Sequence, residues 1–156
     1  IMIRACVILA LISLVSLVRS QCSGGIPSAE VKGFIDAHNE LRQTIAAGNY
    51  VAKGKNMPAS QFPIPDLNWD CEIEKSAQAV ADTCVMEHSN TNLGENLYDA
   101  SSSDKGIGHA TQVFRPRAHS KVDRQFEMAW AATTKIGCGM TACQDGKEVM
   151  VACQYS

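Results

Sequence analysis

An apolar stripe in the first third of the chain gives the clearest structural signal. Between residues 29 and 47, apolar positions and one histidine recur at intervals of three and four residues. They are Val31, Phe34, Ile35, His38, Leu41 and Ile45. This spacing places them on one face of an α-helix. Ser28 can cap the first turn and Gly48 can end the last one, so the pattern predicts a helix over 29–47.

A second helical pattern begins at Asp70 and continues to Met86. Its shared apolar face consists of Ile73, Ala77, Val80, Ala81 and Cys84. The carboxylates of Glu72 and Glu74 lie near the predicted N-terminus, where the helix dipole favours negative charge. The residues between the two helices, 49–65, include three prolines and few apolar side chains, which predicts a loop.

Two alternating segments follow at the C-terminal end of the chain, over 134–143 and 147–155. Alternate residues of each segment are apolar, as in strands that bury one face. The sequence Gln-Asp-Gly at 144–146 has the turn chemistry of a β-hairpin. Helices followed by a hairpin predict an α+β fold, in which the helices pack on an antiparallel sheet.

The first 20 residues have a different character. A basic residue precedes the stretch 5–18, which is almost entirely apolar, and Val18 and Ser20 occupy the positions that signal peptidase recognises. A comfortable membrane span needs about 20 apolar residues. The sequence therefore predicts a signal peptide over 1–20 and a mature domain over 21–156 without a stable membrane span. An uncleaved signal anchor is the alternative.

Composition and charge narrow the functional classes. The chain has 156 residues, and its 14 basic and 16 acidic side chains give a formal net charge of -2. This length is enough for one domain. The charge excludes nucleic-acid binding by bulk attraction. Hydrophobic residues make up 46% of the chain and charged residues 19%, which is typical of a globular protein.

The seven cysteines of the chain point to an oxidising compartment, provided that the predicted signal peptide exports it. Cleavage after residue 20 removes Cys6 and leaves an even number. The remaining cysteines are Cys22, Cys71, Cys84, Cys138, Cys143 and Cys153. They predict a disulfide framework whose connectivity the spacing leaves open. A metal site is the alternative, but the chain has no C-x-x-C pair.

Several longer motifs resemble one protein family. In chain order they are HNELR (38–42), LNWDCEIEKSAQAVADTC (67–84), GENLY (94–98), GHATQ (108–112), MAWAATTKIGCG (128–139) and VACQYS (151–156). The chain therefore resembles the CAP superfamily, or SCP domain, which includes cysteine-rich secretory, antigen 5 and pathogenesis-related proteins. The sequences of these motifs are most similar to those of the activation-associated secreted, venom-allergen-like proteins of parasitic nematodes.

This resemblance implies an α-β-α sandwich in which Cys138 and Cys153 pair across the C-terminal hairpin. It leaves the other two bridges unassigned. A helix with a W-x-x-E-type motif is expected between GENLY and GHATQ, yet only residues 99–107 stand there. The segment 113–127 also separates GHATQ from MAW, which are adjacent in the family. We therefore expect an incomplete sandwich with an atypical segment at 113–127.

The resemblance also implies a central cleft with two histidines and two glutamates. His88 and His109 match the histidine positions, and Glu95 of GENLY matches one glutamate position. The second glutamate would belong to the missing helix. The two histidines can bind Zn²⁺, since neutral imidazole suits that ion. Hydrogen bonds that hold the shape of the cleft are the alternative role for these residues.

The two other histidines receive no ligand role. His38 lies on the apolar stripe and is interpreted as a packed, hydrogen-bonded residue, and His119 falls in the atypical segment. A hydrolase site could be assembled from Ser89, His88 and Glu95. However, the chain has no G-x-S-x-G motif, and neighbouring side chains of an extended segment diverge. We therefore expect no catalytic residues.

Together these features predict a secreted, extracellular protein that is not an enzyme and requires no cofactor. The resemblance implies a non-catalytic effector that contacts host extracellular or cell-surface proteins. One alternative is a sterol- or lipid-binding protein, with the loop 49–65 as a candidate lid. A divalent-metal-binding protein, with Zn²⁺ at His88 and His109, and a metal-dependent hydrolase are the others.

Overall fold

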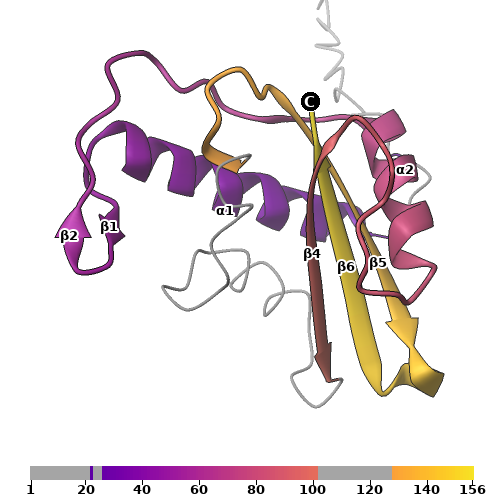
Figure 1. Ribbon diagram of the computed structural model, residues 1–156. Helices are drawn as coiled ribbons and strands as arrows, with labels where there is room; N and C mark the ends of the chain where they lie inside the picture. The colour runs from indigo at the N-terminus through magenta and orange to yellow at the C-terminus, as the bar shows by residue number, and fades with distance from the viewer. Residues whose placement is uncertain (1–21, 23–25, 102–127) are drawn as a thin grey trace, which may run out of the picture.

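The computed structural model describes Cys22 and the ranges 26–101 and 128–156 (Figure 1). Residues 1–20, predicted as a signal peptide, lie outside the described residues, and so does the atypical segment 113–127. The same is true of His109 and His119. In the described part of the chain, no helix combines the length and the hydropathy that crossing a membrane requires.

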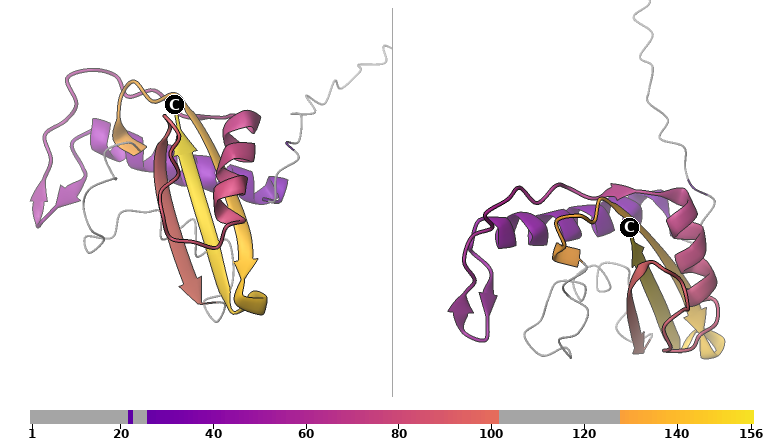
Figure 2. Two further views of the ribbon diagram at one scale, coloured as in Figure 1. Left: turned by 45° about the vertical axis from the view of Figure 1, so that its right-hand side comes forward. Right: turned by 45° about the horizontal axis from the view of Figure 1, so that its top comes forward.

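A four-stranded sheet forms the centre of the fold. One helix lies on each side of it (Figures 1 and 2). The elements are α1 (Ser28–Ala46), β1 (Val51–Ala52), β2 (Lys55–Asn56), β3 (Asn68–Trp69), α2 (Cys71–Ala81), β4 (Gly94–Ser101), β5 (Lys135–Cys143), the short 3-10 turn η1 (Gln144–Gly146) and β6 (Glu148–Tyr155). The strand order is β3-β5-β6-β4, and only the β3–β5 pair is parallel. The α+β prediction is confirmed.

Alternation along the strands gives the sheet two apolar faces. The cluster on one face includes Phe34 and Leu41 of α1 with Ile136, Cys138, Val151, Cys153 and Tyr155. The cluster on the other face includes Ala77 and Ala81 of α2 with Cys143, Met150 and Ala152. The sandwich therefore has the α-β-α layering that the resemblance implies, and the apolar faces predicted for both helices are the ones that pack.

Helix α2 lies so close to β5 that two strand positions have no room for a side chain. A Cβ atom at Gly137 would lie 2.1 Å from the backbone nitrogen of Glu74. One at Gly139 would lie 2.2 Å from the Cα atom of Gln78. Both distances are shorter than any that real Cβ atoms adopt. The two glycines therefore set the spacing between the helix and the sheet.

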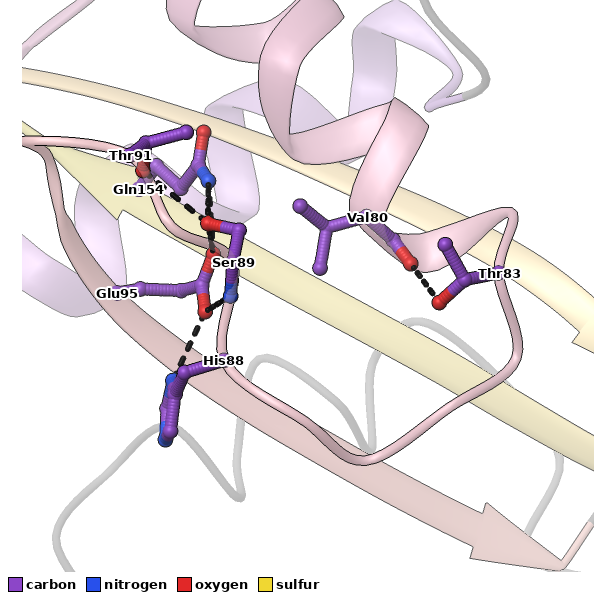
Figure 3. Close-up of polar contacts among 7 residues, drawn as sticks. All are labelled: Val80, Thr83, His88, Ser89, Thr91, Glu95 and Gln154. Atoms are coloured by element: carbon purple, nitrogen blue, oxygen red, sulfur yellow. Dashed lines mark hydrogen bonds and ion pairs between the residues drawn. The ribbon is translucent and has the colours of Figure 1, made fainter.

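Helix α2 begins where the sequence predicts and ends earlier. The Asp70 carboxylate caps it by accepting hydrogen bonds from the backbone N–H groups of Glu72 and Ile73, at 3.0 and 3.1 Å. The helix ends at Ala81 rather than at Met86, so the predicted end is wrong. Two residues explain this difference. The Thr83 hydroxyl donates to the carbonyl of Val80 (Figure 3), and Cys84 has a positive φ of 53°.

Helix α1 differs slightly from its prediction at its start. Pro27, rather than Ser28, occupies the N-cap position, and its side chain makes no capping bond. The Pro27 carbonyl instead accepts hydrogen bonds from the N–H groups of Glu30 and Val31, at 2.8 and 3.2 Å. Gly48 ends the helix with a φ of 72°, as predicted.

Three parts of the sheet structure were not predicted. The expected loop 49–65 contains the β1–β2 hairpin, whose turn residues Lys53 and Gly54 both have positive φ. The two-residue strand β3 is too short for a sequence pattern to reveal. β4 has poor strand formers, such as Gly94 and Asn96, and depends on eight paired positions along β6. Its residues 99–101 fill the start of the interval in which the family helix is expected, and 102–107 lie outside the described residues.

All six cysteines that follow residue 20 form disulfide bonds. The bridges are Cys22–Cys71, Cys84–Cys143 and Cys138–Cys153. The predicted disulfide framework and the pairing implied across the hairpin are both present. Of the two bridges that the sequence left unassigned, one attaches the start of α2 to Cys22 and the other attaches the turn after α2 to the end of β5.

Arg42, in the HNELR motif, is a buried cation that the sequence did not predict as part of the core. Its Nε donates to the carbonyl of Pro65 at 2.8 Å. Its other nitrogens donate to the carbonyls of Met128 at 2.7 Å, Trp130 at 3.1 Å and Thr133 at 2.9 Å. A single guanidinium therefore joins α1 to the segment before β3 and to the segment before β5.

Replacing Gly137 by alanine adds a methyl group where the α2 backbone leaves no space. We expect the free energy of unfolding to fall by about 3 kcal/mol, because the helix must move off the sheet. Ala142→Gly makes the reverse exchange at an exposed position of the same strand and should cost about 1 kcal/mol. Urea unfolding measures both losses. Equal losses would show that α2 does not lie against β5 in this way.

Candidate functional site

Glu95 is the buried centre of the candidate site. It lies in β4, directly opposite Gln154 of β6, and its side chain is 3% exposed. Leu97, two residues further along β4, packs in the α2-side cluster, so strand alternation places Glu95 on that side as well. The loop between α2 and β4 brings His88 and Ser89 onto the same carboxylate.

Four donors surround the two oxygens of Glu95 (Figure 3). Oε1 accepts hydrogen bonds from the backbone N–H of Ser89 at 2.9 Å and from Nδ1 of His88 at 2.8 Å. Oε2 accepts from the Ser89 hydroxyl at 2.5 Å and from Nε2 of Gln154 at 2.7 Å. Thr91 lies 3.1 Å from the Ser89 hydroxyl and extends the network toward solvent.

These contacts favour the ionised form of the carboxyl. Burial by itself raises the pKa of Glu95, because it removes water from the charged form. The hydrogen bonds from Ser89, Gln154 and His88 together exceed that effect and hold the pKa below its ordinary value. Glu95 is therefore a carboxylate at neutral pH, with both oxygens engaged.

His88 contacts Glu95 through one ring nitrogen and is partly exposed to solvent. Its side chain is 37% exposed. Because a carboxylate can only accept, Nδ1 carries the proton of the neutral ring and Nε2 carries the lone pair. A histidine that donates one N–H to a carboxylate has the orientation of a metal ligand.

Comparison with known proteins identifies the family. The model of the cysteine-rich secretory protein family, CAP, matches residues 35–155. The chain belongs to the CAP family. The resemblance inferred from its motifs is confirmed.

The CAP relatives include venom and secreted proteins. The chain is 29% identical to venom allergen 5 of Microctonus hyperodae, over 88% of this chain and 72% of that protein. It is 30% identical to the Ancylostoma secreted protein of Ancylostoma caninum, over 78% of this chain but only 35% of that protein. The crystal structure of NaASP2 with Zn²⁺ superposes with a TM-score of 0.76 at 28% identity, over 87% of this chain and 84% of that one.

Of the three CAP cleft positions predicted from motifs, the structure brings two together. His88 and Glu95 are in direct contact, and His109 lies outside the described residues. The sequence missed Gln154, which is fully buried and holds Oε2 of Glu95. Only the β4–β6 register reveals its position, and β4 was not predicted.

His38 is a packed residue, as its place on the apolar stripe suggested. Nδ1 donates to the carbonyl of Phe34 at 2.7 Å, and Nε2 accepts from the Tyr155 hydroxyl at 3.0 Å. Burial lowers the pKa of His38 to about 4, and the nearby charge of Arg42 acts in the same direction against the Phe34 hydrogen bond. The ring is therefore neutral at physiological pH, and both of its nitrogens form hydrogen bonds inside the core.

A second cluster of potential metal ligands is not a metal site. The sulfurs of Cys22 and Cys71 and a carboxylate oxygen of Glu74 lie within 4.8 Å of one another. However, the two sulfurs form a disulfide. A metal ligand of this kind must be a thiolate, so the cluster lacks two of its three donors.

We expect Glu95→Gln to destabilise the protein by about 3 kcal/mol at pH 7, because an amide cannot accept from four donors. The loss must shrink in acid. The pKa of Glu95 is lower in the folded chain than in the unfolded chain, so its contribution is complete above the ordinary glutamate pKa and disappears as the pH falls below it.

Urea unfolding of both proteins at neutral pH and at about pH 3 measures this change. Glu87→Gln is the matched control, since it removes the same charge from an exposed position in the same loop. A difference between wild type and Glu95→Gln that stays constant with pH would contradict the network.

Proposed function

We propose that this CAP protein is a secreted, extracellular effector that acts by binding host proteins and catalyses no reaction. The arrangement around Glu95 is the observation that carries the proposal. The carboxylate lies between the Ser89 hydroxyl and the His88 ring and accepts from both. A hydrolase of the serine type needs the imidazole between the hydroxyl and the acid.

The same contacts leave neither Ser89 nor Glu95 prepared for acid–base work. Ser89 donates its proton to a carboxylate and accepts from Gln154 at 3.1 Å, so its oxygen is held in a structural network. Glu95 is ionised and has both oxygens occupied, whereas a general base needs a free position toward its substrate. These side chains support the loop that follows α2.

Exposed aromatic side chains support the protein-binding part of the proposal. Phe62 is 74% exposed and Trp130 is 62% exposed. They belong to the two segments that Arg42 joins through the carbonyls of Pro65 and Trp130. Aromatic side chains on anchored loops are typical of the residues that contribute most to protein interfaces. We refer to Phe62 and Trp130 as the aromatic pair.

The location is inferred from the relatives and from covalent structure. Venom and secreted proteins are among the sequences that this chain resembles. Three disulfides in a chain of this length suit an oxidising compartment. Export through a signal peptide over 1–20 stays a prediction, and so does the alternative of sterol or lipid binding beneath the loop 49–65.

Saturable binding of the labelled protein to intact host cells tests the effector proposal. We expect protease treatment of the cell surface to abolish binding, and the double variant Phe62→Ser, Trp130→Ser to weaken it at least about tenfold, since it removes two aromatic contacts. Val85→Ser, at an exposed apolar residue of another loop, is the control and should leave binding unchanged.

Two outcomes would overturn the proposal. Binding that survives protease treatment would point to lipid rather than protein. Turnover of esters or peptides that His88→Ala removes would make the protein an enzyme.

We propose Zn²⁺ binding as a second function, because His88 has the orientation of a metal ligand. Its Nε2 and the imidazole of His109 would hold the ion, with Glu95 as the partner that orients His88. Of the described residues, His88 fits the role of a zinc ligand. Glu95 does not, since both of its oxygens already accept hydrogen bonds. A bound Zn²⁺ would add positive charge and connect the two histidines. A relative of known structure, NaASP2, was solved with this ion.

Calorimetric titration with Zn²⁺ tests the second function. We expect His88→Ala and His109→Ala each to abolish the binding heat, and Glu95→Gln to weaken binding about 10-fold to 100-fold through loss of orientation. His119→Ala is the control. Unchanged affinity in both His88→Ala and His109→Ala would place any zinc elsewhere.

A further inference from the structure

A groove with a volume of about 1010 Å³ lies between the first half of α1 and the residues that lead into α2. Val31, Ile35 and Asp36 line it from α1, and Leu67, Trp69 and Glu74 line it from the other side. Its size is at the upper end of the range for small-ligand sites. Neither His88 nor Glu95 is among its lining residues, so it is separate from the candidate site described above.

The wall of this groove contains a carboxylate with an unmet hydrogen bond. Glu74 is 1% exposed, and its Oε2 accepts from the indole N–H of Trp69 at 2.5 Å. Its Oε1 is buried and has no hydrogen-bond partner among the described residues. A buried carboxylate oxygen without a donor is costly, because water has been removed and nothing replaces it. The site therefore favours a ligand that donates a hydrogen bond.

The charged side chains of the groove determine which charge the donor group of the ligand should carry. Among the described residues that line the groove, three carboxylates, those of Asp36, Asp66 and Glu74, stand against the single ammonium of Lys32. Lys32 forms an ion pair with Asp36, one helical turn further along α1. The remaining charge is negative, which attracts a cation and repels fatty acids and other anions.

Apolar side chains share the rest of the lining with the polar residues Ser28, Asn39 and Asn68. Ile26, Val31, Ile35 and Leu67 supply aliphatic surface, and Trp69 adds an aromatic face close to Glu74. Apolar surface combined with a few placed polar groups is typical of sites for small ligands. An aliphatic or aromatic body can therefore occupy the groove while a polar head reaches the carboxylate.

We propose that this groove binds a primary amine with an apolar body, whose ammonium donates to Oε1 of Glu74 and whose body packs between α1 and Trp69. Because Oε1 is covered, a neighbouring side chain must shift to admit the ammonium. Trp69 hydrogen-bonds to Glu74, so its indole reports that movement. The proposal concerns a ligand and a site beyond the effector function and does not depend on it.

A set of three ligands with the same chain tests the proposal on the unmodified protein. Octylamine, octanol and octanoate are titrated below their aggregation limits, with tryptophan fluorescence and binding heat as readouts. We expect octylamine to bind at least about tenfold more tightly than octanol, and octanoate to bind most weakly, because charge decides the order. Equal affinities, or a preference for octanoate, would overturn the proposal.

Variants locate the site. Glu74→Gln keeps the shape of the side chain and removes its charge, and we expect it to abolish the preference for the amine over octanol. Glu72→Gln is the matched control, because it removes the same charge from an exposed position of the same helix turn and should change nothing. An unchanged preference in Glu74→Gln would overturn the assignment.

If Glu74→Gln does not fold, Ile35→Lys provides a second test of where the amine binds. It adds a positive charge to the α1 wall without disturbing the Glu74 contacts, and it should weaken octylamine binding at least about tenfold while octanoate gains. Octylamine affinity that Ile35→Lys leaves unchanged would show that the amine binds outside this groove.

Discussion

The fold depends on a buried guanidinium that is neutralised by dipoles rather than by a carboxylate. Arg42 is completely buried and directs its N–H groups at four backbone carbonyls. Burial lowers the pKa of Arg42, and the charge of Asp66 opposes that change. Charge-assisted hydrogen bonds of this kind are among the strongest a protein makes. The cation therefore fixes where two irregular segments run.

Neighbouring residues of the same motif extend this control to the sheet. Asn39 accepts from the N–H of Leu67 at 2.7 Å, which positions the chain just before β3. His38 bonds to the Tyr155 hydroxyl, and the amide of Asn96 donates to the same hydroxyl at 3.0 Å. Asn96 is the residue after Glu95 in β4. One helical turn of α1 thus sets the position of both edges of the sheet, and through β4 the position of the buried carboxylate.

The periodicity of apolar residues was sufficient to predict the helices and strands that bury one face. The stripe of α1, the face of α2 and the alternation of β5 and β6 all have local patterns, and all their bounds except the end of α2 were predicted closely. β4 and β3 have no such pattern, because their pairing partners are distant in the sequence. The same reason hid Arg42, Glu74 and Gln154. A charged or polar residue gives no sign of burial until the groups that satisfy it are brought together by the fold. His88 and Glu95 were located only through the resemblance to the CAP family.

The way in which Arg42 holds the aromatic pair has an evolutionary consequence. The guanidinium contacts only main-chain oxygens in the two segments, and every amino acid provides such an oxygen. The side chains that these segments display can therefore be exchanged without weakening their anchor. Selection can diversify the outward chemistry of residues 62 and 130 while the scaffold beneath them stays the same. Such a separation allows one fold to acquire new binding partners by single substitutions.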